Sequence, residues 1–452
     1  MRTIIENGLV VDPSNKICSK LDVAVEEGKI KELAARKLVG DKVIDAQGLV
    51  VSPGFVDIHM HEDAYNAVEE RFEIDILACM LKMGVTTAIG GNCGIGPEKP
   101  DLYMNAAERL GLPVNLGLLL PHETLRRAVN ISDRYGRSSL DEIREMVRLA
   151  EYYLDCGCLG MSYGIRYIPG LSAPEMLELN KVVSRRHKLV AAHVRNDASE
   201  ALQALSEFLQ SGPDAEVSFQ VSHIGSIAAY GQMEDFLALL DEFCSIGIDV
   251  AADCYPYAAF STRIGTTTFD EGFINRYGGD YGQIEAAEGE FKGQRLNEDL
   301  YRYLRQKAPE TLMIAHVMKD DEVSLAFSHP KVLMGSDGLL HHSQGHPRAA
   351  GAFPRFIKNY VREKKLLGLC EAVSKITCQP ARRIGIDKGT LGIGKNADIT
   401  IFDYERIADK ATFTDPVLSP EGIAYVILEG EIAVKDGCVL QNNLGKMVRS
   451  KH

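Results

Sequence analysis

The chain has 452 residues, of which 45% are hydrophobic and 25% are charged, the composition of an ordinary globular protein. A net charge of −13 gives no basic footprint for nucleic acid, and no stretch approaches the roughly 18 uninterrupted apolar residues that span a membrane. The first residues also lack the layout of a signal peptide, so we expect an acidic cytoplasmic protein whose ten cysteines are reduced thiols.

Both ends of the chain have the pattern of short β-strands. In residues 1–53, apolar segments such as 21–25 and 43–46 are separated by turns that contain glycine, a spacing typical of antiparallel strands. Residues 386–452 have the same character, with strand-like segments at 398–402 and 424–428. We therefore predict a small discontinuous β-sandwich domain built from the two ends.

The middle of the chain, residues 54–385, alternates apolar strands with helical stretches. Repeated strand–helix units indicate a parallel sheet, and about eight of them over roughly 330 residues predict an α/β fold, a (β/α)₈ TIM barrel. The apolar run 312–317 would be a ninth strand, and we assign it to an insertion. Residues 265–295 are rich in glycine and charge and long for a connection, which suits an active-site lid or a tolerated surface insertion equally.

Side chains of the kind that bind metals stand at the ends of five predicted strands. Active sites of such barrels lie at the carboxyl ends of the strands, and two residues that are two apart on a strand point to the same face. Imidazole and thiolate groups suit zinc. The six residues are His59 and His61 on the first strand, Cys93 on the second, His193 on the fifth, His223 on the sixth and Asp337 on the last.

Taken singly, each of these residues has a simpler explanation, because a buried histidine or cysteine usually serves packing and an aspartate before glycine usually belongs to a turn. Their coincidence at the strand ends favours a metal site. A zinc-bound water loses a proton near neutral pH, and a nearby carboxylate can take that proton and deliver it to a leaving nitrogen. Asp337 is the predicted general base and acid, and Cys93 could bind one zinc ion or bridge two.

Several motifs resemble those of the amidohydrolase superfamily and, within it, the D-aminoacylases, also called N-acyl-D-amino-acid deacylases. The resemblance covers nearly the whole chain. The segment 91–94 is similar to the family's Gly-Asn-Cys-Gly, and 193–196 is similar to its His-x-Arg-Asn. The other matching segments are 57–61, 222–223, 253–257, 336–338, 346–348, 353–355 and 394–398.

This resemblance implies zinc-dependent hydrolysis of the amide bond of a small N-acyl-D-amino acid. It implies one tight zinc ion, and a second divalent metal that is weaker or absent. It also implies three residues that hold the substrate's α-carboxylate, among them an arginine whose planar group can bind a carboxylate bidentately. The tight site would use Cys93, His193 and His223, and the second site would use His59, His61 and Asp337. The carboxylate would contact Arg348 and, at the end of the seventh predicted strand, Tyr255 and Ser261.

The sequence also leaves questions open. Ile224 follows His223 where many family members carry a lysine, so the recognition of the substrate's side chain and acyl group is unassigned. Arg166 and Arg263, near the predicted mouth, could favour an acidic substrate or be solvated charges.

Three other functions stay in competition. A cyclic-amide hydrolase of the hydantoinase or dihydroorotase type is the alternative within the enzymes, although Cys93 stands in place of a strand-end lysine. A deaminase would leave Cys93 and Arg348 unexplained. A catalytically inactive barrel that acts as a binding module would be metal-free and insensitive to chelators.

Overall fold

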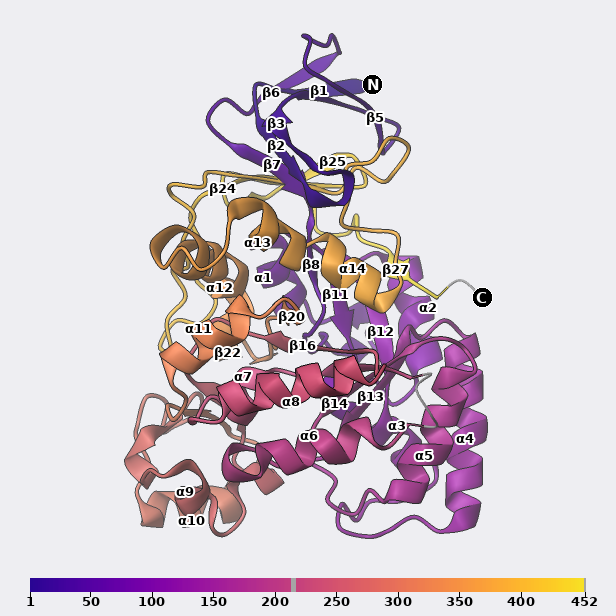
Figure 1. Ribbon diagram of the computed structural model, residues 1–452, viewed down its shortest axis with the longest axis vertical. Coiled ribbons are helices and arrows are strands. Elements are labelled where there is room, and N and C mark those ends of the chain that lie inside the picture. The colour runs from indigo at the N-terminus through magenta and orange to yellow at the C-terminus, as the bar shows by residue number, and fades with distance from the viewer. Residues whose placement is uncertain (213–216, 451–452) are drawn as a thin grey trace.

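A computed structural model describes residues 1–212 and 217–450. A helix-wrapped barrel occupies the centre, a β-domain caps one end, and a separate insertion lies at the other end (Figure 1). None of the ten cysteines forms a disulfide. Among the described residues, no helix is both long and apolar enough to cross a bilayer.

Eight parallel strands form the barrel, as the sequence predicted, in the order β20-β16-β15-β14-β13-β12-β11-β8. Their residues are almost all buried, because helices cover the outside and side chains fill the inside, which explains the continuous apolar runs in the sequence. A parallel bridge between Met60 and Gly338 links the ends of the row. The strands are β8 (Phe55–Asp57), β11 (Val85–Gly90), β12 (Asn115–Pro121), β13 (Gly160–Gly164), β14 (Leu189–His193), β15 (Ser218–Val221), β16 (Val250–Cys254) and β20 (Val332–Met334).

Amphipathic helices follow the strands and bury their apolar faces against the sheet. The helices predicted over 140–154 and 198–209 are present as α4 and α6, and α4 begins at a capping box in which Ser139 and Glu142 bond reciprocally. The helices are α1 (Ile76–Lys82), α2 (Pro100–Leu110), α3 (His122–Ala128), α4 (Leu140–Asp155), α5 (Ala173–Ser184), α6 (Ala201–Leu209), α7 (Ile224–Ala228), α8 (Met233–Ser245), α11 (Asp320–Ser328), α12 (Arg348–Arg355), α13 (Leu369–Lys375) and α14 (Cys378–Ile384).

The β-domain draws strands from both ends of the chain, in two sheets that enclose a core of isoleucine and valine. One sheet has the order β26-β25-β24-β23-β7-β2-β3 and the other the order β5-β4-β1-β6. The tail then returns to the barrel, where β27 (Met447–Val448) pairs with β12. The strands are β1 (Arg2–Glu6), β2 (Leu9–Asp12), β3 (Ile17–Lys20), β4 (Asp22–Glu26), β5 (Lys29–Ala34), β6 (Lys42–Asp45), β7 (Val50–Pro53), β23 (Ile399–Phe402), β24 (Ile423–Leu428), β25 (Glu431–Lys435) and β26 (Cys438–Val439).

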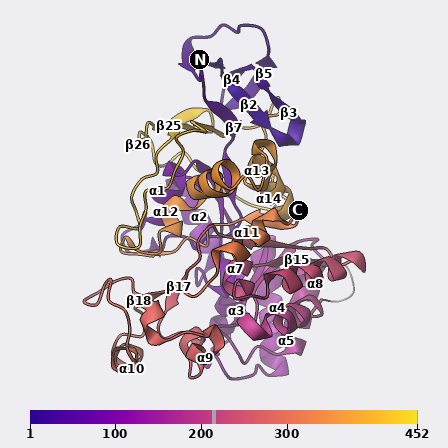
Figure 2. The ribbon, with the colours of Figure 1, turned by 60° about the vertical axis from the view of Figure 1, so that its left-hand side comes forward.

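The insertion between β16 and β20 has its own small antiparallel sheet, in the order β17-β19-β18. The apolar run 312–317 supplies β19 (Leu312–Ala315) of this sheet, so it is part of an insertion and not a ninth barrel strand. With β17 (Phe260–Arg263), β18 (Ile284–Ala286), α9 (Phe273–Tyr277) and α10 (Glu298–Lys307), the inserted segment extends beyond the predicted 265–295. Figure 2 shows it at the end of the molecule opposite the β-domain.

Candidate metal centre and substrate pocket

The six residues predicted to bind metal converge at the carboxyl end of the barrel. Nitrogen, sulfur and oxygen atoms of four of them, from β8, β11, β15 and β20 or the turns that follow, lie within 4.8 Å of one another. The Cys93 Sγ atom is 3.4 Å from His59 Nε2 and 3.3 Å from His223 Nε2. Ligands about 2.0–2.3 Å from a tetrahedral zinc ion are separated by about 3.3–3.8 Å, so these spacings fit the ion. The four residues are His59, Cys93, His223 and Asp337.

The two remaining histidines lie at the edge of this cluster. His61 Nε2 is 3.2 Å from Asp337 Oδ1. The His193 ring packs against the His223 ring, with centroids 4.4 Å apart, and its buried Nδ1 atom has no hydrogen-bond partner in the described part of the chain. The two predicted ligand sets are therefore not separated in space, because Cys93 contacts a histidine from each set.

Three residues of the cluster have backbone angles that side chains other than glycine rarely adopt. The φ angle is 54° at Cys93, 35° at His223 and 49° at Asp337. Each such residue costs about 1–3 kcal/mol and persists only where the surrounding structure holds it, which is common at functional sites. In each case the chain turns sharply just past a barrel strand, and the side chain points into the cluster.

The charges of the cluster favour a thiolate and a carboxylate. Burial by itself would raise the pKa of the Cys93 thiol, but the imidazoles of His223 and His59 outweigh it and hold the pKa well below its ordinary value. Burial would likewise raise the pKa of Asp337, but Arg348 and the neighbouring histidines hold that pKa well below its usual range. Both groups are thus in the form that binds a cation.

Asp253, at the end of β16, supports the cluster from behind and was not among the predicted site residues. Its Oδ1 atom lies 2.9 Å from His59 Nδ1 and accepts from the His223 main-chain nitrogen at 2.8 Å. Its Oδ2 atom accepts from Gln220 Nε2 at 2.9 Å. A carboxylate in this position fixes the orientation of an imidazole whose other nitrogen faces a metal. Its only sequence signal was an aspartate at a strand end inside the segment 253–257.

Of the three residues predicted to hold a carboxylate, Arg348 contacts both Tyr255 and Ser261. The buried Arg348 guanidinium lies 4.6 Å from the centre of the Tyr255 ring, its Nη2 atom donates to Ser261 O at 3.3 Å, and the same atom forms an ion pair with Asp337 Oδ2 at 2.9 Å. Its Nε and Nη1 atoms are buried and have no hydrogen-bond partner among the described residues. Ser261 lines the pocket beside the cluster, whereas Tyr255 and Arg348 lie behind its lining. Ser261 lies on β17 of the insertion and not at the end of β16, because the chain leaves the barrel after Cys254.

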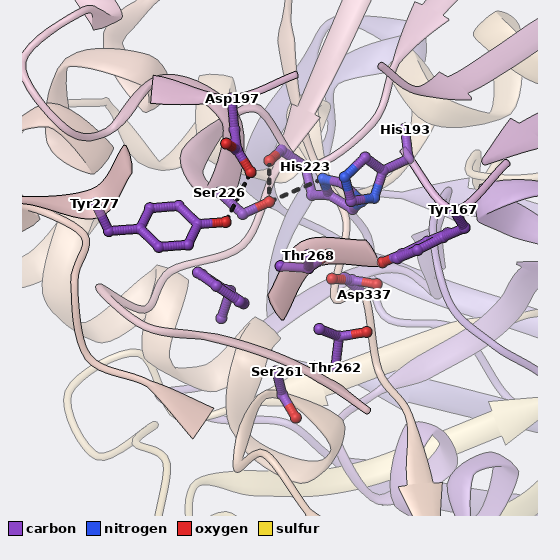
Figure 3. Close-up of a pocket in the computed structure, with 11 residues that line it drawn as sticks. Tyr167, His193, Asp197, His223, Ser226, Ser261, Thr262, Thr268, Tyr277 and Asp337 are labelled. Atoms are coloured by element: carbon purple, nitrogen blue, oxygen red, sulfur yellow. Dashed lines mark hydrogen bonds between the residues drawn. The ribbon is translucent and has the colours of Figure 1, made fainter. Parts of the chain in front are cut away.

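A pocket opens beside the cluster, between the barrel and the insertion, and we call it the inner pocket. Figure 3 shows the residues that line it, with the metal-type residues on one side and Tyr277 on the other. Barrel residues form one wall, and insertion residues such as Ser261, Thr268 and Tyr277 form the other. Asp197 and Tyr277, which sequence reasoning missed, join the walls through a hydrogen bond of 2.8 Å. The insertion therefore forms part of the site, whether or not it also moves as a lid.

Comparisons with known proteins agree with this geometry. Residues 50–433 match the model of the amidohydrolase family. An N-acyl-D-glutamate deacylase from Alcaligenes xylosoxydans xylosoxydans is 31% identical, over 94% of this chain and 92% of the relative, and a D-aminoacylase from the same organism is 30% identical, over 94% and 93%. The crystal structure of N-acyl-D-glutamate deacylase from Bordetella bronchiseptica, complexed with zinc and a phosphonate inhibitor, superposes with a TM-score of 0.88 at 27% identity and 99% coverage of both chains. A dihydroorotase from Aquifex aeolicus is more distant, at 25% identity over 90% of each chain.

Proposed function

The chain belongs to the amidohydrolase family, and within that family we propose that it hydrolyses the amide bond of N-acyl-D-amino acids. The products are a carboxylic acid and a free D-amino acid. The observation that carries the proposal is the buried cluster that contains the Cys93 thiolate, with the Arg348 guanidinium 2.9 Å from its carboxylate member. The relatives named N-acyl-D-glutamate deacylase and D-aminoacylase support the same reaction.

Cys93, His193 and His223 are the proposed ligands of one tight zinc ion, and His59, His61 and Asp337 those of a weaker second divalent metal. The mixed nitrogen, sulfur and oxygen donor set and the 3.3 Å between Cys93 Sγ and His223 Nε2 support a zinc site, and the division into two ligand sets follows the family resemblance. When bound, zinc supplies Lewis-acid activation of a carbonyl group and of water. The solved D-aminoacylase has a binuclear metal centre with one-metal activation and second-metal attenuation, which supports unequal sites here.

Asp337 is the proposed proton carrier. Its Oδ1 atom faces the histidine rings while its Oδ2 atom forms an ion pair with Arg348, so both oxygens of the carboxylate are held. It would take a proton from the attacking water and give it to the amide nitrogen as the carbon–nitrogen bond breaks. The free donors of Arg348 would bind the substrate's α-carboxylate, which fixes the scissile amide beside Asp337.

The direct test measures amine release by the zinc-loaded protein from a panel of N-acetyl D- and L-amino acids, with dihydroorotate and hydantoins as cyclic competitors. We expect the D-enantiomers to be cleaved, and the L-enantiomers and rings to be poor substrates. Preferential ring opening would overturn the linear-amide assignment, and no hydrolysis of any compound would overturn the enzyme assignment.

The second test replaces Arg348 by lysine, which keeps the charge and loses the planar group. Losing one charge-assisted hydrogen bond of about 1.5–3 kcal/mol should lower kcat/KM by about tenfold or more. Blocking the substrate carboxylate as an amide should then harm the natural enzyme more than the variant. Equal hydrolysis of the acid and its amide by the natural enzyme would contradict this role.

Arg355 offers a matched control for Arg348. It lies on the same helix, its guanidinium is also 4.6 Å from a tyrosine ring, that of Tyr257, and it also pairs with an aspartate, Asp409, at 3.1 Å. Neither arginine is among the residues that line the inner pocket, but Arg348 pairs with Asp337, which lines it, whereas Asp409 does not. Arg355→Lys should therefore reproduce any cost in stability without changing the preference for the free carboxylate.

A further inference from the structure

A second pocket, which we call the outer pocket, shares a wall with the inner pocket. Six of the residues that line it carry polar or charged side chains: Arg166, Arg195, Asn196, Thr267, Asp270 and Arg276. Its volume of about 320 Å³ lies in the range of small-molecule sites. At four places, consecutive residues of the chain line the two different pockets, and these pairs are Arg166 and Tyr167, Asn196 and Asp197, Thr267 and Thr268, and Arg276 and Tyr277.

The partition between the pockets is thin. The Arg276 Nε atom is 2.8 Å from Asp197 Oδ1, and its Nη2 atom donates to Thr268 O. Tyr277 donates to the other oxygen of Asp197 at 2.8 Å. One ion pair and one stretch of main chain therefore separate the space beside the metal cluster from the outer pocket.

The charges around the outer pocket do not balance. Three arginines around the pocket each pair with a carboxylate at 2.8 Å. The guanidinium of a fourth, Arg166, has no carboxylate within ion-pairing distance among residues 1–212 and 217–450. Four arginines thus face three carboxylates, which leaves one positive charge. The complete pairs are Arg195 with Glu207, Arg276 with Asp197, and Arg305 with Asp270, whose carboxylate also accepts from Tyr135.

The unmatched charge is buried. Arg166 is 8% exposed, and its Nη1 atom is 3.2 Å from Asn196 Oδ1 and 3.4 Å from Arg195 O. Its Nη2 atom is 3.4 Å from Thr267 O, and its Nε atom is buried without a hydrogen-bond partner among the described residues. All of its contacts are neutral and long. Because a buried cation without a counter-ion is unfavourable, the pocket is complementary to an anion.

Resting on the proposed function, we propose that the outer pocket binds a second carboxylate of the substrate, with Arg166 as its main partner. The substrate class is then the dicarboxylic N-acyl-D-amino acids. One carboxylate contacts Arg348, the amide lies at the metal cluster, and an arm that ends in the other carboxylate extends past Thr268. Two parts of the substrate could carry this second carboxylate: an acidic amino-acid side chain or a dicarboxylic acyl group. The experiment distinguishes the two.

The test compares each acid with its neutral amide. One pair is N-acetyl-D-glutamate and N-acetyl-D-glutamine, and the other is N-succinyl-D-leucine and its terminal amide. We expect the natural zinc-loaded enzyme to favour the acid in one pair by about 10- to 100-fold in kcat/KM, the size of one or two charge-assisted hydrogen bonds. The pair that shows the preference identifies the arm.

Arg166→Gln should abolish that preference: kcat/KM for the acid should fall by about 10- to 100-fold relative to kcat/KM for its amide, and any general cost of the substitution cancels in this ratio. Arg263→Gln is the control, because the Arg263 side chain is 42% exposed, pairs with Glu310, and lies on β17 of the insertion without lining either pocket. It should leave the preference unchanged. An acid-to-amide ratio near one in the natural enzyme, or the same ratio in Arg166→Gln, would overturn the proposal.

A binding measurement keeps the proposal independent of turnover. Calorimetric titration of the zinc-loaded proteins with D-glutamate against D-glutamine, and with succinate against succinamate, should show the same acid preference in the natural protein and its loss in Arg166→Gln. An equal loss for acids and amides would show that Arg166 only fastens Thr267 to the barrel, and would overturn the subsite. Hydrolysis of the neutral substrates without any acid preference would refute the subsite alone, whereas failure to hydrolyse any of the four compounds would refute the deacylase assignment.

Discussion

Replacing Asp253 by asparagine removes a negative charge behind the metal cluster and leaves the side-chain volume unchanged. In the natural protein, one oxygen faces the His59 ring at 2.9 Å and the His223 main-chain nitrogen at 2.8 Å, and the other accepts from Gln220 at 2.9 Å. An asparagine has only one oxygen. If that oxygen keeps His59 and His223, its amino group meets the amino group of Gln220, and two donors face each other.

The expected loss follows from these contacts. Removing the carboxylate that orients a metal-binding imidazole typically lowers metal affinity by about 10- to 100-fold. One charge-assisted hydrogen bond is worth about 1.5–3 kcal/mol, which is the same order when expressed as an affinity. We therefore expect the dissociation constant of the second metal, for which His59 is a proposed ligand, to rise by about 10- to 100-fold in Asp253→Asn, measured by competition with a chromogenic chelator.

A second substitution tests the physical reason. Gln220→Glu, combined with Asp253→Asn, gives the asparagine amino group a carboxylate to donate to, and Arg383 lies close to the same side chain, with its Nε atom 3.4 Å from Gln220 Oε1. The double variant should recover part of the lost affinity. If Asp253→Asn binds the second metal as tightly as the natural protein does, Asp253 does not position the cluster. If the double variant binds no better than the single one, the donor–acceptor argument is wrong.

Three further outcomes are expected. Cys93→Ala should lower both zinc content and activity, and full zinc occupancy in that variant would exclude Cys93 as a ligand. Asp337→Asn should keep zinc but lose at least about 10²–10⁴-fold in turnover, and near-normal turnover would exclude Asp337 as the proton carrier. Burial lowers the pKa of Lys375 from 10.5 to about 8, so the unfolded chain binds its proton more tightly than the folded protein does. Between about pH 7 and about pH 10, the unfolding free energy of the natural protein should therefore rise by about 2–3 kcal/mol relative to that of Lys375→Met, measured by urea titration. A difference in unfolding free energy that does not change with pH would contradict the lowered pKa of Lys375.

The barrel could be predicted because its strands are buried on both faces and appear in the sequence as continuous apolar runs with ligand-type residues at their ends. The β-domain could be predicted equally well, since turns with glycine separate its short strands. The architecture of the insertion could not be predicted, because β17, β18 and β19 are only three or four residues long and pair across long gaps in the chain. Ser261 was consequently expected at the end of a barrel strand, although it lies on β17.

The roles of Asp253 and Arg166 could not be identified from the sequence, for a different physical reason. Asp253 contacts His59 across 194 positions of the chain, and such a contact exists only after eight strands have closed into a barrel. The outer pocket is still harder to predict from the sequence. Arg166 indicates an anion site only because the structure shows that its charged neighbours are paired with other groups and that its own contacts are neutral. A sequence shows that a charge is present, whereas an excess of charge in one place is a property of the fold.

The metal cluster and the closure of the barrel use the same residues, the first through side chains and the second through main-chain atoms. The Asp337 main-chain nitrogen donates to His59 O at 2.7 Å, and the His61 nitrogen donates to Gly338 O at 2.9 Å, so the first and last strands meet at the candidate ligands. The buried Asp57 carboxylate accepts hydrogen bonds from the main-chain nitrogens of His59 and Ser336, so it also links the first and last strands. An ion that binds this cluster in the folded chain alone stabilises the fold in proportion to the logarithm of its concentration over its dissociation constant. The residues proposed for catalysis therefore also hold the barrel shut, which accounts for the strained φ angle of 49° that the chain tolerates at Asp337.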